Sequence, residues 1–409
     1  MKRVGLVTSA ITAIALVLMA GVFLSAAEEK AGEKGDRIRF ASYARDDNNT
    51  QHVFYRNNDG SIIELWSKYG DPKGWNAKDL TAEAKAPKAA GSPAAYFLDK
   101  DNTQHVVYRG ADGNIYELFY MEQRDRTGSW QVNNLTQLTG APRAAGNPAG
   151  YVNERDNSQH VLYRSSDGDV IELFNARKGD NKGWQHQNLT GNLKAPKAEG
   201  DPDGYFLRFN NSQHVVYRDK EGNIHELFLG EGQQQWQHVN LMGQTKAPKA
   251  DGDPCGYVAT NDNTQHVVYR SSEGDIIELY HVPQGRVVGW HAKNLTAEAQ
   301  APKAEGNPVG YFVQDNNTQH IIYRDRDGNL QELFLKERQE RWMHNNLTQQ
   351  AKAPKAASDP SGYYLDKDKT QHVIFRSQDG QIIELYHRAA GEAPGWHANN
   401  LSAALKIGR

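Results

Sequence analysis

The sequence predicts an all-β fold, a seven-bladed β-propeller of four-stranded antiparallel blades, on three observations. The string Gln-His-Val-Val-Tyr-Arg, followed by Asp-Gly and then by Glu-Leu, recurs seven times with small variations. The copies lie 52 to 55 residues apart, and a tryptophan recurs with the same rhythm. Each copy has room for four short strands, and such units repeated seven times fit a closed ring of blades. A solenoid is the alternative, but solenoids have atypical terminal repeats, whereas the end copies here resemble the middle ones. The Gln-His pairs are Gln51-His52, Gln104-His105, Gln159-His160, Gln213-His214, Gln265-His266, Gln319-His320 and Gln371-His372.

Each copy is expected to form its four strands from contiguous chain. The first strand ends near the aromatic of a Gly-Tyr pair such as Gly204-Tyr205, and the second is Gln-His-Val-Val-Tyr-Arg. The third is Ile-x-Glu-Leu-Phe or its Tyr variant, and the fourth runs from the tryptophan to Asn-Leu-Thr, as in residues 184–190. An Asp-Gly or Glu-Gly turn joins the second strand to the third, because glycine supplies the positive φ of a tight hairpin.

The connection between blades is expected to be a stiff crossover. Its sequence, Ala-Pro-Lys-Ala-x-Gly-x-Pro, contains two prolines and a glycine, which exclude a helix there. We expect no helix after residue 27. The first and last copies are complete, so the ring is expected to close by packing of the first blade against the seventh, without a swapped strand.

The repeat sets the domain boundaries. The propeller is placed at residues 38–402, with blades at 38–81, 82–136, 137–190, 191–242, 243–296, 297–348 and 349–402, and residues 403–409 form a C-terminal tail. Residues 1–27 begin with Lys2 and Arg3 before a long apolar run, which is typical of a signal peptide or an N-terminal membrane anchor. Residues 28–37 are charged and contain glycine, as a flexible spacer does. We therefore expect a secreted or extracytoplasmic protein, either free or anchored by its N-terminal segment.

The composition and the repetition argue against several classes of function. The formal net charge of −3 gives no basic footprint for nucleic acid, and the single cysteine, Cys255, excludes an intrachain disulfide. An active site needs distinct residues in one place, whereas the polar residues here are copied seven times, so we expect no enzyme and no cofactor. The recurring histidines are too far apart in the chain to form a metal cluster, and the Asp-Gly turns lack the carboxylate spacing of a calcium loop. We expect no metal site, and a structural hydrogen-bonding role for these histidines.

A recurring arginine and glutamate, eight residues apart, are the first candidate site residues. Pairing the second and third strands through the Asp-Gly turn predicts that Tyr55 lies near Glu64 and Arg56 near Ile63. Both charges then lie between blades, where a charge must be paired or face a wet pocket. They either grip adjacent sugar hydroxyls or form a salt bridge that locks neighbouring blades. The pairs are Arg56/Glu64, Arg109/Glu117, Arg164/Glu172, Arg218/Glu226, Arg270/Glu278, Arg324/Glu332 and Arg376/Glu384.

The recurring tryptophan is the other candidate. An indole stacks well on the apolar face of a sugar ring. The alternative is an anchor of the outer strand that packs over the blade core. These tryptophans are Trp75, Trp130, Trp184, Trp236, Trp290, Trp342 and Trp396.

The string QHVVYR-x-x-DG-x-I-x-EL, followed by tryptophan and by APKA-x-G-x-P-x-GY, resembles the repeat of the Photorhabdus-type seven-bladed propeller lectins, over residues 38–402. The resemblance implies a ring that binds fucose-type or O-methylated sugars in pockets between adjacent blades, often as a homo-oligomer. The six-bladed fungal fucose lectins are similar in kind. Their pockets also use an arginine, a glutamate and aromatics, which match the recurring arginines, glutamates and tryptophans here. The N-terminal apolar segment departs from the soluble lectins.

These observations favour a multivalent carbohydrate-binding lectin whose partners are glycans or glycoconjugates on cell surfaces. Repeated weak sites combine into high avidity, which suits a sevenfold polar constellation. The alternative is a non-catalytic cell-surface protein-interaction scaffold whose pockets are all salt-bridged, because propellers serve many functions. The residue before the recurring glutamate differs between copies, so the seven sites are not expected to bind equally. It is Ile63, Tyr116, Ile171, His225, Ile277, Gln331 and Ile383 in turn.

Overall fold

The computed structural model describes residues 39–71, 74–121, 128–177, 182–284, 288–388 and 394–405. The chain divides into two units, Met1–Asp36 and Arg37–Arg409, and every described residue belongs to the second. The predicted signal peptide or anchor, the spacer and the end of the predicted tail lie outside the described residues. In the described ranges, no helix has the length and apolar character needed to cross a bilayer.

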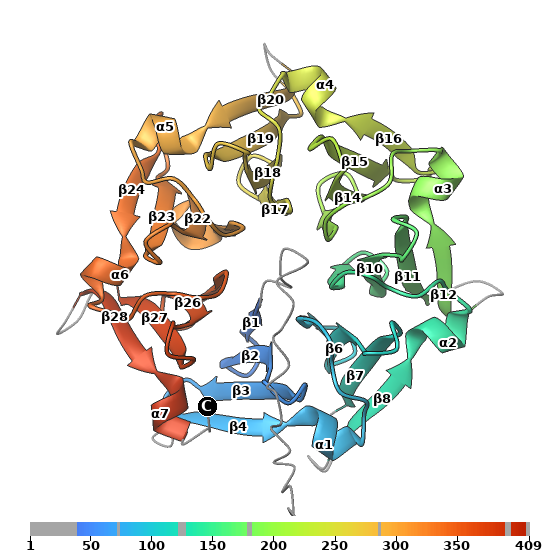
Figure 1. Ribbon diagram of the computed structural model, residues 1–409, viewed down its shortest axis with the longest axis horizontal. Coiled ribbons are helices and arrows are strands. Elements are labelled where there is room, and N and C mark those ends of the chain that lie inside the picture. The colour runs from blue at the N-terminus through green and yellow to red at the C-terminus, as the bar shows by residue number, and fades with distance from the viewer. Residues whose placement is uncertain are drawn as a thin grey trace, which may run out of the picture. The chain divides into compact units, whose positions relative to one another are not determined.

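Seven four-stranded sheets stand around a common axis (Figure 1). Each sheet consists of four consecutive strands, and neighbouring strands within it are antiparallel. The predicted seven-bladed propeller with blades of contiguous chain is therefore confirmed. In blade order, the strands are β1 (Ala41–Arg45), β2 (Thr50–Arg56), β3 (Ile62–Lys68) and β4 (Trp75–Asp79); β5 (Ala94–Leu98), β6 (Thr103–Arg109), β7 (Ile115–Met121) and β8 (Trp130–Asn134); β9 (Ala149–Asn153), β10 (Ser158–Arg164), β11 (Val170–Ala176) and β12 (Gly183–Asn188); β13 (Asp203–Leu207), β14 (Ser212–Arg218), β15 (Ile224–Leu229) and β16 (Gln237–Asn240); β17 (Cys255–Ala259), β18 (Thr264–Arg270), β19 (Ile276–Val282) and β20 (Gly289–Asn294); β21 (Val309–Val313), β22 (Thr318–Arg324), β23 (Leu330–Leu335) and β24 (Met343–Asn346); β25 (Ser361–Leu365), β26 (Thr370–Arg376), β27 (Ile382–Arg388) and β28 (Gly395–Asn400).

The turn between the second and third strands of each blade contains a glycine with positive φ, as predicted. In the first blade, the Asn57 amide donates to the Ser61 carbonyl at 2.7 Å, which leaves three residues in the loop. Gly60 ends this loop with a φ of 83°. A three-residue hairpin loop that ends in a left-handed glycine is a common alternative to the two-residue turn.

This loop changes the strand register by one residue from the prediction. Tyr55 lies opposite Ile63, and Phe54 lies opposite Glu64. The prediction that Tyr55 pairs with Glu64 and Arg56 with Ile63 is wrong, because that pairing assumes a two-residue turn and the loop holds three residues. Arg56 and Glu64 consequently share one face of the sheet, but they are displaced along it.

A short helix follows the fourth strand of every blade, contrary to the prediction of no helix. In the third blade, the Asn188 side chain accepts a hydrogen bond from the Gly191 amide at 2.7 Å, which caps the helix N-terminus. The Thr190 hydroxyl accepts from the Val170 amide at 3.0 Å and ties the helix to the third strand. Asn-Leu-Thr is thus a helix cap and first turn. The helices are α1 (Leu80–Ala84), α2 (Leu135–Thr139), α3 (Leu189–Leu193), α4 (Leu241–Thr245), α5 (Leu295–Ala299), α6 (Leu347–Gln350) and α7 (Leu401–Leu405), with one 3-10 turn, η1 (Gln314–Asn316).

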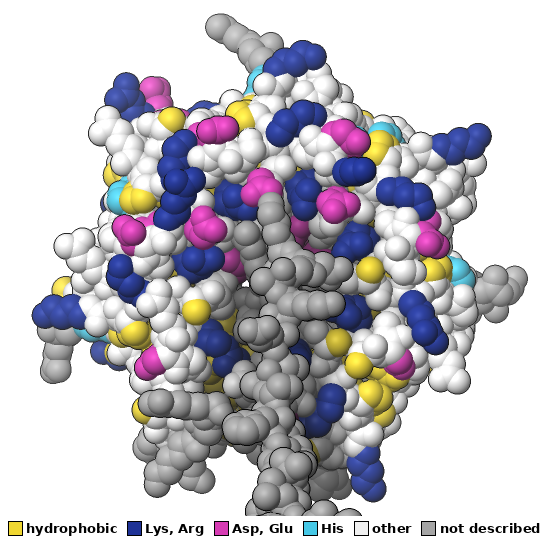
Figure 2. Space-filling view, viewed as in Figure 1, with side chains coloured by type: hydrophobic (Ala, Val, Ile, Leu, Met, Phe, Trp, Pro, Cys, Tyr) yellow, Lys and Arg dark blue, Asp and Glu magenta, His cyan; other side chains and the backbone are white. Residues whose placement is uncertain are grey.

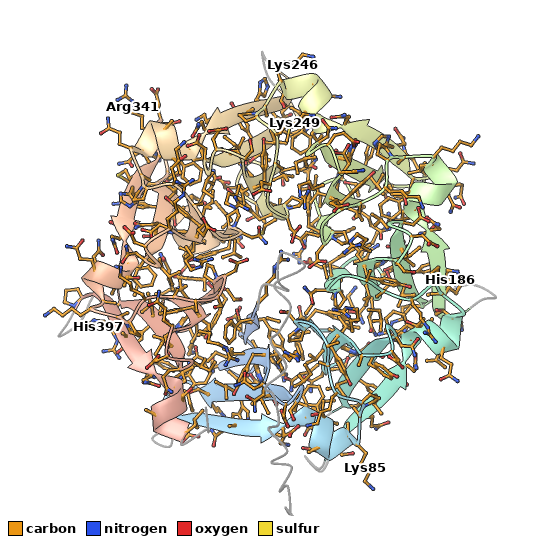
Figure 3. The ribbon with its side chains drawn as sticks, viewed as in Figure 1. Lys85, His186, Lys246, Lys249, Arg341 and His397 are labelled. Carbon is orange, nitrogen blue, oxygen red and sulfur yellow. The ribbon has the colours of Figure 1, made fainter. Side chains whose placement is uncertain are left out.

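The core consists of apolar clusters that lie between adjacent blades, where Figure 3 shows side chains filling the gaps between the ribbons of neighbouring blades. One of them joins the first and seventh blades and includes Tyr55 and Tyr363. Across the same interface, the Tyr363 hydroxyl donates to the Gln51 side chain at 2.8 Å, and Arg376 donates to the Arg56 carbonyl at 3.3 Å. The predicted closure by packing, without a swapped strand, is confirmed.

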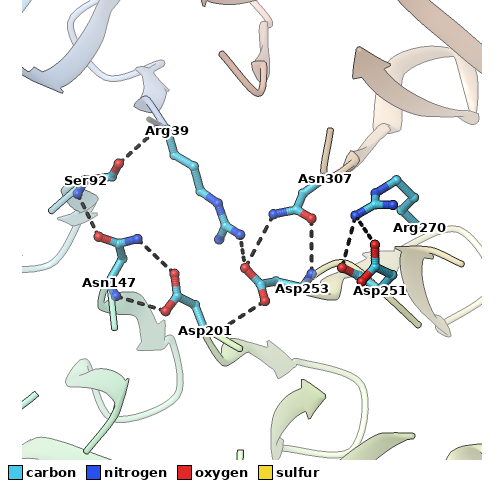
Figure 4. A network of polar contacts seen from close by, with 8 residues as sticks. All are labelled: Arg39, Ser92, Asn147, Asp201, Asp251, Asp253, Arg270 and Asn307. Atoms are coloured by element: carbon cyan, nitrogen blue, oxygen red, sulfur yellow. Dashed lines mark hydrogen bonds and ion pairs between the residues drawn. The ribbon is translucent and has the colours of Figure 1, made fainter. Parts of the chain in front are cut away.

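A ring of polar contacts runs through Arg39, Ser92, Asn147, Asp201 and Asp253 (Figure 4). The backbone amide of one member donates to the side chain of the next, as from Asn147 to Asp201 at 3.0 Å and from Asp201 to Asp253 at 3.2 Å. Arg39 forms an ion pair with Asp253 on a distant blade. Burial and the neighbouring Asp253 carboxylate raise the pKa of Asp201 to about 6. This ring links blades that are far apart in the chain.

Candidate functional site

Each recurring glutamate is buried against the recurring histidine of its own blade. Glu278 is 3% exposed, and its Oε1 lies 2.8 Å from Nδ1 of His266. The same contact occurs in every blade at 2.8 or 2.9 Å, so the predicted hydrogen-bonding role of the histidines is confirmed. The pairs are His52–Glu64, His105–Glu117, His160–Glu172, His214–Glu226, His266–Glu278, His320–Glu332 and His372–Glu384.

Further contacts fix the position of this carboxylate. Nε2 of His266 lies 2.7 Å from the Thr264 hydroxyl, which donates to Asp262 at 2.6 Å. The Tyr257 ring stacks on the His266 ring with centroids 4.8 Å apart. The Tyr257 hydroxyl then donates to Gln319 of the next blade at 2.9 Å. Glu278 is therefore held rigidly at an interface between two blades.

The recurring arginines lie at the crossover end of their strands, where two of them bind backbone and Arg270 forms an ion pair with Asp251 at 2.9 Å. Nε of Arg56 donates to the Ala89 carbonyl at 2.8 Å, and Nε of Arg109 donates to the Gly146 carbonyl at 3.2 Å. Among the described residues, no recurring arginine forms an ion pair with a recurring glutamate, so the salt-bridge alternative is wrong. The prediction that the arginine and glutamate of one copy hold a sugar together required the two side chains to lie side by side, and the structure does not place them so.

A cavity of about 440 Å³ lies between the fifth and sixth blades and brings a recurring glutamate and a recurring tryptophan together. Glu278 comes from the fifth blade and Trp342 from the sixth. Nε1 of Trp342 is buried and has no hydrogen-bond partner. Tyr280 and Lys293 line the same cavity, and the Lys293 ammonium lies 5.9 Å from the Tyr280 ring centroid. Arg270 is not among the lining residues. The complete lining is Asp262, Thr264, His266, Glu278, Tyr280, Val282, Pro283, Gln284, Lys293, Gln319, Leu335 and Trp342.

The same juxtaposition recurs where the ring closes. Nε1 of Trp75 in the first blade donates to Oε2 of Glu384 in the seventh at 3.2 Å. Asn399 donates to the same oxygen at 3.1 Å. Here the indole and the carboxylate satisfy each other, whereas Trp342 has no such partner. The inter-blade sites are therefore not equivalent.

The tryptophans also pack in the inter-blade core, as the anchor alternative predicts. Trp342 is 3% exposed and belongs to a cluster with Ile321 and Leu333. Trp130, Trp236 and Trp396 are similarly buried, and Trp75, Trp184 and Trp290 are half-buried. One side chain can serve both roles, because Trp342 packs in this cluster and also lines the cavity.

Sequence reasoning missed two kinds of lining residue. Tyr280 follows Glu278 by two positions, so the alternation of side chains along a strand places both on one face. Thr264 precedes His266 by two positions for the same reason. An aromatic recurs at the Tyr280 position in every copy, and this was the available signal. The aromatics are Trp66, Phe119, Phe174, Phe228, Tyr280, Phe334 and Tyr386.

Three further features bear on function. A second cavity of about 420 Å³, lined by the inner strands of the second to fourth blades and by the turns that follow them, contains none of the predicted site residues. In the described ranges, no three His, Cys, Asp or Glu side chains are grouped as metal ligands would be.

On the face seen in Figure 2, basic and acidic side chains are interspersed, so that face shows no continuous basic surface.

Solved structures share this architecture at low sequence identity. The BP39L lectin from Burkholderia pseudomallei aligns with a TM-score of 0.65 and 13% identity, over 88% of this chain and 98% of that one. The fold is that of a known lectin. A triple arginine-to-alanine mutant of AofleA from Arthrobotrys oligospora aligns with a TM-score of 0.51 and 16% identity, over 76% and 87% of the two chains. No protein-family model matches the sequence. No curated protein matches it either. The structural likeness supports the fold expected from the lectin resemblance.

Proposed function

We propose that the protein is a multivalent lectin that binds fucose-type or O-methylated sugars in pockets between adjacent blades. The observation that carries this proposal is the cavity in which Glu278 and Trp342 meet from neighbouring blades. The fold shared with a bacterial lectin adds support.

The chemistry of the cavity suits a monosaccharide. Its volume of about 440 Å³ is within the range of small-molecule sites. A carboxylate such as Glu278 accepts strong hydrogen bonds from hydroxyl groups, and the Lys293 ammonium lines the same cavity as a donor. Aromatic walls pack on the C–H face of a sugar ring. Pro283 and Leu335 offer apolar surface to a methyl group, whether at C6 of fucose or on a methylated oxygen.

The number of sites, the non-catalytic role and the location of the protein belong to the same proposal. Repetition of the Glu–Trp pairing around the ring provides several sites on one rigid body, which raises avidity for clustered glycans. The buried glutamates and histidines bond to one another in every blade, an arrangement that serves rigidity better than catalysis. We propose a binding protein, not an enzyme, that acts outside the cytoplasm on surface glycoconjugates, free or anchored by residues 1–27.

A glycan array probed with the labelled full chain tests this function. We expect binding to fucosylated or O-methylated glycans and none to unrelated sugars. Titration calorimetry with methyl α-L-fucoside then compares wild type with Glu278→Gln, which keeps the side-chain volume but removes the charge. The variant should bind fewer sugars per chain, while Glu221→Gln, in an exposed turn, should match wild type. If no fucosylated or methylated glycan is bound, the lectin proposal fails and a non-catalytic interaction scaffold, without the salt-bridged pockets first expected of it, replaces it.

A further inference from the structure

The strand position that Leu335 occupies varies widely between blades. Leu335 lines the cavity between the fifth and sixth blades, beside Trp342. It lies opposite Gln319 in the strand pairing, and His281 and His387 lie opposite the equivalent glutamines. In blade order the position holds Ser67, Tyr120, Asn175, Leu229, His281, Leu335 and His387.

The two histidines lie beside the candidate tryptophans. The His281 ring is 5.4 Å from the Trp290 ring, at an interplanar angle of 61°. The His387 ring is 5.3 Å from the Trp396 ring, at 53°. Both histidines are half-buried, and Nδ1 of His281 is buried without a hydrogen-bond partner. Each ring is only partly buried beside a tryptophan, and a neutral imidazole offers a nitrogen acceptor to a ligand hydroxyl.

We propose that His281 and His387 are specificity-determining residues of the pockets between blades four and five and between blades six and seven, and that these two pockets bind neutral sugars only while the imidazoles are uncharged. This inference rests on the proposed lectin function. The other five pockets carry serine, tyrosine, asparagine or leucine at this position, which are uncharged near neutral pH. The histidine of the His–Glu pair is common to all seven blades, so only the additional imidazole distinguishes these two sites from the other five.

The surroundings of His281 favour its neutral form. Burial lowers its pKa, and the neighbouring His214 and His291 lower it further, while Glu226 of the preceding blade opposes them. Protonation then removes the imidazole as an acceptor and places a charge against the tryptophan ring.

His387 has matching surroundings in the seventh blade. Burial lowers its pKa, Glu332 opposes the shift, and His320 and His397 reinforce it. Because both pKa values lie below the ordinary value of histidine, both imidazoles are neutral at pH 7.5 and become charged as the pH falls. For a sugar that binds only the neutral form, affinity falls about tenfold for each pH unit below the pKa.

The test is titration calorimetry of the full chain with methyl α-L-fucoside at pH 7.5 and at the lowest pH at which the chain stays folded, because the pKa of each imidazole is lowered from its ordinary value. The double variant His281→Leu with His387→Leu installs the residue that blades four and six already carry. Wild type should lose two sites, or bind at them at least several-fold more weakly, at the lower pH. The double variant should show no such loss, and Asn175→Leu should keep the wild-type pH response. Circular dichroism at both pH values checks the fold, and asparagine replaces leucine if the leucine variant does not fold.

The outcomes separate the two proposals. If the sugar binds but wild type and the double variant respond to pH identically, the inference about His281 and His387 is wrong and the lectin function stands. If neither protein binds the sugar at either pH, both proposals fail.

Discussion

Replacing Trp342 by alanine tests whether the recurring tryptophan holds two blades together while it lines the candidate pocket. Its side chain is 3% exposed and packs with Tyr257, Ile321 and Leu333 from both sides of the interface. Truncating a tryptophan in such a setting costs about 3–5 kcal/mol, from lost burial and from the cavity that remains. The free energy of unfolding should fall by that amount.

Because the propeller is large, this loss of unfolding free energy lowers the Tm only slightly. The described part of the chain extends from residue 39 to residue 405. An unfolding entropy of about 2.1 cal/mol/K per residue gives about 0.8 kcal/mol/K for a domain of this length. Trp342→Ala should therefore lower the Tm by about 4–6 °C. Trp342→Phe, which keeps an aromatic ring in the wall, should lower it by only about 1–2 °C.

Differential scanning calorimetry measures both shifts, and Phe209→Ala is the control because Phe209 is an exposed aromatic. The control should melt as wild type does. A Tm for Trp342→Ala within 1 °C of wild type would refute the packing role of this side chain. Calorimetric titration of the folded variant with methyl α-L-fucoside should also show one site fewer.

The helix caps, the turn glycines and the polar ring each give a further prediction. Asn188→Ala removes the cap of α3 and should lower the free energy of unfolding by about 0.5–2 kcal/mol, measured by thermal unfolding. Gly222→Ala should destabilise by more than about 1 kcal/mol, because φ is +77° and the added Cβ would lie 2.8 Å from a crossover carbonyl; Gly232→Ala, at a φ of +73° with open space around it, should cost less in the same assay. Asp201, whose pKa is raised to about 6, holds its proton more tightly in the folded chain than in the unfolded one, so its contribution to stability is lost as pH rises from about 4 through 6. Asp201→Asn should melt above wild type at pH 7.5 and together with it near pH 4, and a constant difference across this range would contradict the assignment.

The sequence was enough to predict the blades because hydrophobic alternation and turn glycines act locally. The repeat placed four strands in each copy, and the structure has them. The prediction from the sequence was wrong at two local details. The turn after Arg56 holds three residues, so Glu64 lies opposite Phe54. The Asn-Leu-Thr string fits a strand end as well as a helix cap, and the helix forms because the capping asparagine and the buried leucine stabilise it together.

The site was harder to predict because its residues meet across blade boundaries. Spacing within one copy suggested that Arg270 would accompany Glu278, yet the partner that lines the cavity is Trp342 of the following blade. Neighbouring blades are related by the ring, and a single repeat contains no signal for which of its side chains face the next copy. Contacts between neighbouring blades also make the tryptophans differ. Trp75 binds Glu384, whereas Trp342 has no hydrogen-bond partner at Nε1.

The most direct test is a crystal structure of the full chain grown with methyl α-L-fucoside. Our account predicts a sugar between Trp342 and Glu278, with its hydroxyl groups on the carboxylate and its C–H face or methyl group on the aromatic and apolar wall. Sugar bound only away from the inter-blade pockets, or empty pockets at saturating sugar, would contradict it.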